Sequence, residues 1–157
     1  RSIFKAHYLR TRPHMKTISV QGSMGDGFAI EVDCGNHRVL IDQPRAAFGT
    51  DAGPSPLELV LAALAGCFGT IGRFLAHQRK VELRGMRFEV EADYDPAGLL
   101  GRDTSVRPGF EEVRLRVEID ADMTLEQKQE FLAEVERRCP LADNLLHGTR
   151  LHSALVG

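Results

Sequence analysis

A long apolar stretch in the middle of the chain dominates its hydrophobic pattern. From Leu59 to Gly72, every residue except Thr70 is apolar or small. Ser55 and Glu58 form a capping box, and the proline after Ser55 suits the first helical position. This pattern predicts a helix that begins after Ser55 and ends near Lys80. Because such a helix has no polar face, we expect it to be buried on all sides.

Alternating apolar and polar residues predict strands on both sides of this helix. Three short strands in a meander are expected before it, and two longer ones follow it, joined by a loop rich in glycine and proline. A last strand is expected at the end of the chain. The expected positions are 17–21, 28–34, 39–42, 85–95, 112–120 and 149–156. Cys34 lies on the apolar face of the second strand and is interpreted as a small buried hydrophobic residue.

Two further helices are predicted before the last strand. Thr124 and Gln127 form a second capping box, and the helix that it opens ends in two arginines. Cys139 and Pro140 break this helix, because proline cannot continue a helix interior. Pro140 can begin a new short helix, which Gly148 then ends.

The predicted element order is therefore βββ-α-ββ-α-α-β, and the fold class is α+β. Each predicted sheet has one apolar face, whereas the central helix needs cover on more than one side. A single copy supplies too little sheet for this. Two chains whose sheets close over paired central helices would bury both helices, so burial predicts a homodimer.

Composition and charge limit which partners and which cellular compartment we expect for the protein. The 157 residues carry a net charge of −2 with mixed signs, which favours one domain and gives no reason to expect a nucleic-acid or acidic-lipid partner. The central helix is too short and too rich in glycine to be assigned as a membrane span. Three widely spaced cysteines indicate a reducing, cytoplasmic setting. The absence of tryptophan argues against stacking platforms for bases or sugars.

The beginning of the chain is set apart from the rest. Residues 1–14 show no clear hydrophobic period and lack the apolar core of a signal peptide. We interpret them as a tag or a disordered tail ahead of Met15. Residues 15–157 are then expected to form a single domain.

Two of the three cysteines are candidates for chemistry. Cys67 lies inside the apolar helix, where a lone cysteine is usually a packing residue. Cys139 lies at or next to a helix N-cap, where backbone amides, together with Arg137 and Arg138, would lower its pKa. Its helical register also turns it inward. Two inward thiols are candidates for a peroxidatic and resolving pair, in which one becomes a sulfenic acid and the other closes a disulfide.

These motifs together are similar to those of a known family. The run GPSPLEL at 53–59 is followed by AGCF at 65–68, and CPL at 139–141 is followed by Leu145 and Gly148. This two-part pattern, with the element order, resembles the OsmC/Ohr family over roughly 17–156. The resemblance implies an intertwined homodimer with two sheets around central helices. It also implies a thiol-dependent peroxidase that reduces organic hydroperoxides and is reset by a thiol reductant, with Cys67 peroxidatic and Cys139 resolving.

The chain departs from the family pattern at one position. Family peroxidases carry a glutamate directly after the motif proline, paired with an arginine from an upstream loop, and Leu57 stands at that position here. Glu58 comes one residue later, on the helix face opposite Cys67, and is interpreted as a capping residue. Arg45 is the candidate for the arginine, with Arg38 as the second choice. The resemblance therefore points to the less characterised OsmC-like branch.

Other chemistries find little support, and alternative functions stay open. The histidines show no metal-ligand spacing, and no phosphate loop, nucleotide fingerprint or serine nucleophile motif is present, so no metal or cofactor is expected. The apolar surroundings of Cys67 favour alkyl or fatty-acyl peroxides over hydrogen peroxide.

One alternative is an inactive dimer that binds a small molecule or lipid. Another is a redox sensor whose disulfide signals to a partner.

Overall fold

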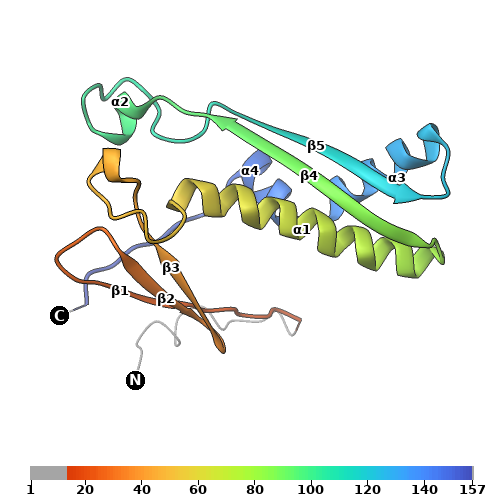
Figure 1. Cartoon of the computed structure of the whole chain (residues 1–157), viewed down its shortest axis with the longest axis horizontal. Helices are drawn as coiled ribbons and strands as arrows, with labels where there is room; N and C mark the ends of the chain where they lie inside the picture. Colours follow the sequence, from red (N-terminus) through yellow and green to blue (C-terminus); the bar gives the residue numbers. More distant parts are fainter. Residues whose placement is uncertain (1–13, 157) are drawn as a thin grey trace. The chain divides into compact units, whose positions relative to one another are not determined.

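Three short antiparallel strands form the first of two units into which the chain divides at Pro56 (Figure 1). The computed structural model describes residues 14–156, so the predicted tail lies almost entirely outside the described residues. The first unit contains β1 (Gln21–Met24), β2 (Ile30–Cys34), β3 (His37–Ile41) and the short 3-10 helix η2 (Arg45–Ala47). The strand order in the sheet is β1-β2-β3.

The second strand shows the predicted alternation. Along β2, Ile30, Val32 and Cys34 are half-buried, whereas the two acidic residues between them are exposed. Gly35 adopts a φ of +62°, which a two-residue hairpin requires and glycine allows. This turn places Cys34 opposite His37, so β3 begins two residues earlier than predicted.

The first strand does not lie where the alternation placed it. The predicted strand over 17–21 is wrong, because β1 covers Gln21–Met24. The register of the sheet decides this: Gln21 pairs with Asp33 and Met24 pairs with Ile30, which leaves the preceding residues without a partner strand. Ile18, which the pattern placed on a strand, is 95% exposed.

A buried carboxylate organises the loop that follows β3. Asp42 is 1% exposed, and its oxygens accept hydrogen bonds from the backbone amides of Gln43, Thr50 and Ala52 at 2.8 to 3.1 Å. The Thr50 hydroxyl donates a further bond at 2.6 Å. These bonds, led by that of the Thr50 hydroxyl, lower the pKa of Asp42 from 3.8 to about 2. The loop from Gln43 to Gly53 is therefore folded around one ionised group.

Replacing Asp42 with asparagine is expected to lower the free energy of unfolding at pH 7. Because the folded-state pKa lies below the unfolded value, the stability from the ionised group is present above pH 4 and is lost as pH falls towards 2. The gap between wild type and Asp42→Asn should therefore narrow from pH 4 to pH 2 in denaturant titrations. Asp26→Asn, in an exposed turn of the same unit, is the control. A gap of constant size over this range would contradict the assignment.

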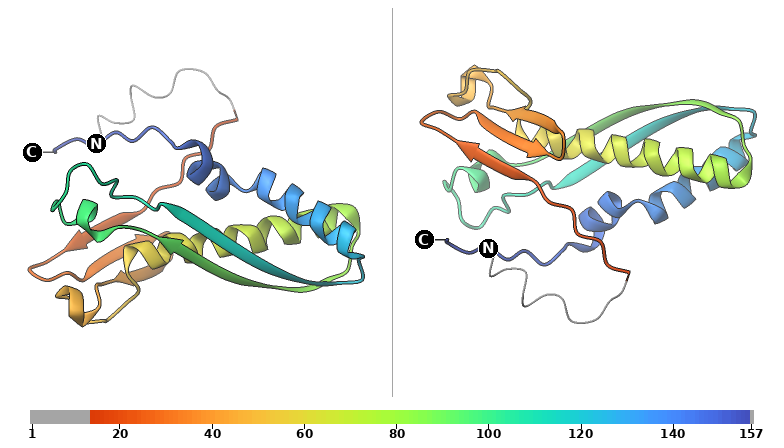
Figure 2. Two further views of the ribbon diagram at one scale, coloured as in Figure 1. Left: turned by 90° about the horizontal axis from the view of Figure 1, so that it is seen from above. Right: turned by 90° about the horizontal axis from the view of Figure 1, so that it is seen from below.

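The second unit pairs one long helix with a two-stranded ribbon and two shorter helices (Figures 1 and 2). It contains α1 (Pro56–Arg79), β4 (Leu83–Asp93), the short α2 (Pro96–Leu99), β5 (Glu112–Ala121), α3 (Leu125–Arg138) and α4 (Pro140–His147). The antiparallel β4–β5 ribbon runs along α1 in each view of Figures 1 and 2. The core lies between these elements and includes Leu64, Phe68 and Leu75 of α1 with Phe131 and Val135 of α3.

The helix boundaries follow the capping signals. Helix α1 begins at Pro56, directly after Ser55. At the start of α3, the Thr124 hydroxyl accepts from the Gln127 amide, and the Gln127 side chain accepts from the Thr124 amide. Helix α4 begins at Pro140, and Gly148 ends it with a φ of +71°. The predicted helix ends are therefore confirmed to within one residue at each of these points.

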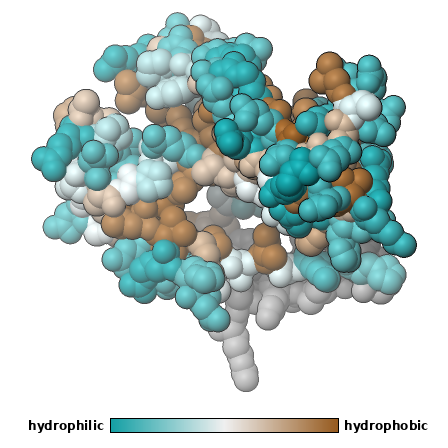
Figure 3. All heavy atoms as spheres, turned by 45° about the vertical axis from the view of Figure 1, so that its right-hand side comes forward, coloured by the Kyte–Doolittle hydropathy of each residue, from teal (hydrophilic) through white to brown (hydrophobic). Residues whose placement is uncertain are grey.

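The central helix is not buried on all sides within one chain, which corrects that prediction. The buried residues of α1 are Leu64, Phe68, Gly72, Leu75 and Ala76. Val60 and Phe74 on the same helix are exposed, and apolar side chains also reach the surface on the face of the molecule in Figure 3. The sequence analysis expected a single copy to have too little sheet to cover this helix, and one two-stranded ribbon with α3 indeed cannot surround its 24 residues.

The last predicted strand is absent from the described residues. Residues 149–156 form no strand and no helix, and Leu155 is 100% exposed. A strand exists only when a second strand supplies hydrogen-bond partners. The prediction of a strand over 149–156 is therefore wrong for the structure of the single chain.

Candidate functional site

The two cysteines predicted to act together lie side by side in the second unit. Helix α1 carries Cys67, and the junction of α3 and α4 carries Cys139. Their Sγ atoms are 2.8 Å apart, although 72 positions separate them in the sequence. A disulfide bond is about 2.05 Å long, so the two sulfur atoms would need to approach by about 0.75 Å to form one. Both thiols are free in this structure.

The position of Cys139 follows from the proline after it. Cys139 is the C-cap of α3 and also the N-cap of α4, with an extended backbone at φ −79° and ψ 114°. Pro140 forces this conformation, because the residue before a proline is disfavoured in the helical region. The kink turns the side chain into the core, where Cys139 is 1% exposed. The predicted N-cap position of Cys139 is confirmed.

Both sulfur atoms meet backbone amides at the beginning of α4. The Ala142 amide donates to the Sγ of Cys139 at 3.4 Å, and the Leu141 amide donates to Cys67. Helix N-terminal amides carry partial positive charge, so they favour a thiolate over a thiol. This first turn of α4 is the polar part of an otherwise apolar site.

Burial opposes those amides at Cys67. Loss of hydration raises the pKa of Cys67 above its ordinary value, and the neighbouring Cys139 thiol raises it further, whereas the Leu141 amide acts in the opposite direction. The resting state of Cys67 at neutral pH is therefore a thiol, and an additional positive group is needed to stabilise its thiolate.

The two arginines predicted to favour a thiolate at Cys139 have other partners. Arg137 pairs with Glu134 at 2.7 Å. Arg138 donates to the side chain of Gln78 at 2.9 Å and lies 4.0 Å from Glu134. The α4 amides, rather than these guanidinium groups, therefore make the hydrogen bonds to sulfur.

The family of the chain follows from its match to known proteins. The family model of OsmC-like proteins matches residues 49–153, which include both cysteines and most of the second unit.

The chain belongs to the OsmC-like family.

Solved structures agree with this membership in fold. An OsmC-like protein from Mycoplasma pneumoniae superposes with a TM-score of 0.73 at 20% identity, over 84% of this chain and 89% of that one. An organic hydroperoxide resistance protein, OsmC, from Legionella pneumophila gives 0.65 at 19%, over 85% and 92%. One from Elizabethkingia anophelis gives 0.66 at 18%, over 87% and 92%. No curated protein matches the chain.

The remaining predicted residues of this OsmC-like chain lie in the first unit or at its border. Arg38 is held by two ion pairs on its own sheet, with Asp33 at 2.9 Å and Glu31 at 3.2 Å. Arg45 lies in η2, inside the loop that Asp42 organises. Cys34 is half-buried on β2 rather than fully buried. Arg45 is therefore the more available of the two candidate arginines.

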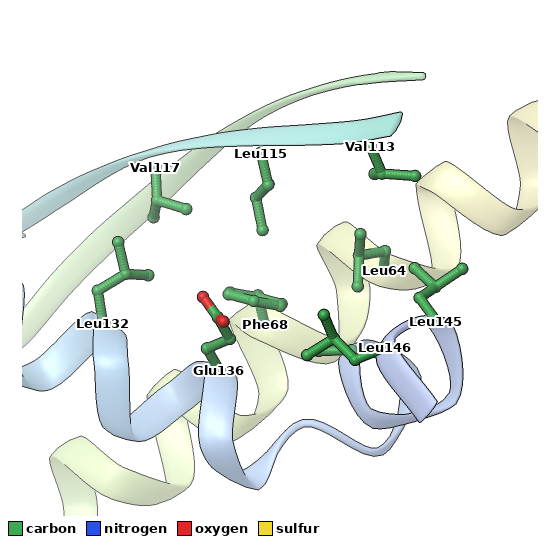
Figure 4. Close-up of a pocket in the computed structure, with 10 residues that line it drawn as sticks. Leu64, Phe68, Val113, Leu115, Val117, Leu132, Glu136, Leu145 and Leu146 are labelled. Atoms are coloured by element: carbon green, nitrogen blue, oxygen red, sulfur yellow. The ribbon is translucent and has the colours of Figure 1, made fainter. Parts of the chain in front are cut away.

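The second unit also contains a largely apolar pocket of about 220 Å³ (Figure 4). Its walls come from α1, β5, α3 and α4. Nine of the lining residues are apolar: Leu64, Phe68, Val113, Leu115, Val117, Leu132, Ala142, Leu145 and Leu146. Neither cysteine lines the pocket, but its wall residues Phe68 and Ala142 belong to the same core cluster as Cys139, and Cys67 packs against that cluster.

The tenth lining residue, Glu136, is one that the sequence analysis missed. It lies on α3, four residues after Leu132, so both side chains share one helix face. That spacing was the available signal, because Leu132 belongs to the apolar stripe of the helix. The carboxylate points into the pocket between α3 and β5 (Figure 4).

Two other possible site types were considered for the described part of the chain. Within residues 14–156, no group of three or more histidine, cysteine or acidic side chains is arranged to hold a metal ion. Helix α1 is long and apolar enough to cross a membrane by length and composition, a test that core helices also pass. In this structure α1 contributes Leu64, Phe68 and Leu75 to the core.

Proposed function

We propose that this OsmC-like chain is a thiol-dependent peroxidase that reduces organic hydroperoxides. The observation that carries the proposal is the 2.8 Å separation of the Cys67 and Cys139 sulfur atoms. Membership in the OsmC-like family supports it, as do structural neighbours described as organic hydroperoxide resistance proteins. The apolar pocket of the second unit suits an organic substrate.

The different exposure of the two thiols supports the proposed roles of Cys67 and Cys139. Cys67 is half-buried, whereas Cys139 is 1% exposed, so an entering peroxide reaches Cys67 first. The Cys67 thiolate attacks one peroxide oxygen and the O–O bond breaks, which gives Cys67 sulfenic acid and an alkoxide that takes up a proton to become an alcohol. The peroxide gains two electrons, and the sulfur loses two.

The second step uses the neighbouring thiol. The Cys139 sulfur attacks the sulfenic sulfur of Cys67, a disulfide forms, and the hydroxyl leaves with a proton as water. A thiol reductant then returns two electrons and two protons by thiol–disulfide exchange, which restores both thiols. The amides of α4 contact both sulfurs and can stabilise the thiolate that each step requires.

The protein is further proposed to act as a cytoplasmic homodimer. The exposed apolar residues Val60 and Phe74 on α1 would be covered by a second copy of the chain. A second copy could also supply the cover that the single chain lacks around α1.

Thiol counting after one equivalent of cumene hydroperoxide tests the proposal. The wild type is expected to lose two free thiols and two hydrogens in mass, which indicates a disulfide. Cys139→Ser is expected to stop at a sulfenic acid that dimedone traps on Cys67. Unchanged thiols in the wild type, or a disulfide that includes Cys34, would overturn the proposal.

The raised pKa of Cys67 favours one other function. If no positive group offsets burial, Cys67 stays protonated, and the chain would be a dimer that binds a small molecule in its apolar pocket. The two functions differ in thiol reactivity. A native protein whose Cys67 reacts with a thiol reagent as slowly as a buried thiol, and consumes no hydroperoxide, would support the binding function.

A further inference from the structure

One charged side chain lines the otherwise apolar pocket of the second unit. Glu136 projects from α3 towards the space between Phe68 and the strand that carries Leu115 (Figure 4). Glu136 is the charged member of the ten residues that line the pocket, and because it is exposed, its carboxylate is also in contact with water. The pocket therefore presents a negative charge as well as an apolar surface to a ligand.

The charge of Glu136 is not neutralised by its neighbours. Within the described residues 14–156, no ion pair or hydrogen bond involves its carboxylate. The two arginines at the same end of α3 contact Glu134 instead, Arg137 at 2.7 Å and Arg138 at 4.0 Å. Glu134 thus uses both nearby cations, and Glu136 contributes unbalanced negative charge to the pocket wall.

We propose that this pocket holds the organic part of the substrate and that Glu136 makes the site select uncharged hydroperoxides over those that carry a carboxylate. The inference rests on the proposed peroxidase function. The wall residues Phe68 and Ala142 also belong to the buried core cluster that contains Cys139 and against which Cys67 packs, so the pocket and the thiol pair share part of one cluster. An anionic ligand would meet a like charge there without a counter-ion.

The size of the pocket narrows the substrate class further. Its volume of about 220 Å³ is below the roughly 300–1,000 Å³ of pockets that bury drug-sized ligands. A compact alkyl or aryl hydroperoxide matches this volume better than a long acyl chain. The selected class is therefore a compact, uncharged organic hydroperoxide, which is narrower than the alkyl or fatty-acyl class expected from the sequence.

A matched pair of substrates tests this selection. Cumene hydroperoxide and its para-carboxylate differ only in the charged group, and the measured quantity is the ratio of their second-order rate constants for Cys67 oxidation at pH 7. We expect the wild type to favour the neutral compound about tenfold, which allows for solvent screening at the exposed Glu136. Glu136→Gln should bring the ratio close to one by raising the rate constant for the para-carboxylate.

Glu130→Gln is the matched control. It removes the same charge from an exposed position of α3 that does not line the pocket, so the ratio should stay at the wild-type value. A wild-type ratio near one, or an equal change in Glu136→Gln and Glu130→Gln, would overturn the role of Glu136 and leave the peroxidase function intact.

The affinity of the product alcohols distinguishes the proposal about pocket selectivity from the proposal of a peroxidase function. Cumyl alcohol and its para-carboxylate undergo no redox step, so their affinities can be measured by calorimetry even in an inactive protein. If no thiol is oxidised but the neutral alcohol binds more tightly, and Glu136→Gln removes the difference, the selectivity holds and the peroxidase function fails. If neither alcohol binds, the inference about the pocket is wrong, whatever the thiols do.

Discussion

Replacing Cys67 with serine is expected to reduce peroxidase turnover at least a thousandfold, to the rate of the uncatalysed reaction. A serine hydroxyl is not ionised at neutral pH and cannot replace a thiolate as the nucleophile. The measurement is consumption of cumene hydroperoxide with dithiothreitol as reductant. Cys139→Ser should keep the first oxidation step, because Cys67 is still present, and should slow only the steps that follow.

Cys34→Ser is the control for this loss. Cys34 lies on β2 in the first unit and faces the apolar side of a short sheet, so its replacement should leave turnover within about twofold of wild type. Turnover above a tenth of wild type in Cys67→Ser would exclude Cys67 as the nucleophile. An equal loss in Cys34→Ser would point to a general effect on folding instead.

The pH dependence of the same reaction follows from the environment of Cys67. Because burial raises the pKa of this thiol, only a small fraction is thiolate at neutral pH. The rate of the first step should then rise roughly tenfold per pH unit until the pH reaches the pKa. A rate that is already constant near pH 7 would show that a positive group lowers the pKa of Cys67 in the working protein.

Replacing Phe131 with alanine is expected to cause the largest loss of stability of any single change considered. Phe131 is 0% exposed, and its ring packs in the core shared by α1 and α3. Truncation of a buried phenylalanine removes apolar contacts and leaves a cavity, which costs about 3–5 kcal/mol. The free energy of unfolding should fall by that amount in denaturant titrations at one fixed protein concentration.

Leu125→Ala on the same helix provides the comparison. Leu125 is 69% exposed, so its loss should change the free energy of unfolding by less than about 0.5 kcal/mol. A cost below about 1 kcal/mol for Phe131→Ala would mean that the core can close around the missing ring. Because Phe131 lies two turns before Cys139, this variant should also slow disulfide formation between Cys67 and Cys139.

Features set by neighbouring residues were predictable from the sequence. The capping box of Thr124 and Gln127 and the break at Pro140 involve residues at most a few positions apart, and the structure shows both. The placement of Cys139 at a helix N-terminus follows from the same local rule. The motif pattern then gave the family, which the match over residues 49–153 confirms.

Features set by distant pairing were harder to predict. Residues 149–156 were expected to form a strand, yet within the described residues no second strand pairs with them, and a local pattern cannot reveal a pairing partner. The first strand was misplaced for the same reason, because the register with β2 decides its bounds. The apolar pattern of α1 does not show whether the residues that cover this helix belong to the same chain or to a second copy.

The sequence analysis did not identify the roles of two polar residues, because hydrophobic periodicity gives no information about polar contacts. Asp42 comes directly after a strand, and nothing in the sequence shows that amides eight and ten residues later turn back onto its carboxylate. Glu136 looks like an ordinary solvent-facing residue of an amphipathic helix. Its role depends on β5 lying opposite α3, which is a tertiary feature of the fold.

The long sequence separation of the thiol pair links redox state to heat resistance. A bond between Cys67 and Cys139 would close a loop of 72 residues, and cross-linking so long a loop reduces the entropy of the unfolded chain by an amount equivalent to about 4 kcal/mol near room temperature. The oxidised protein should therefore melt at a higher temperature than the reduced one. In a cell under oxidative stress, the molecules that have just reacted would be those most resistant to unfolding and to proteolysis.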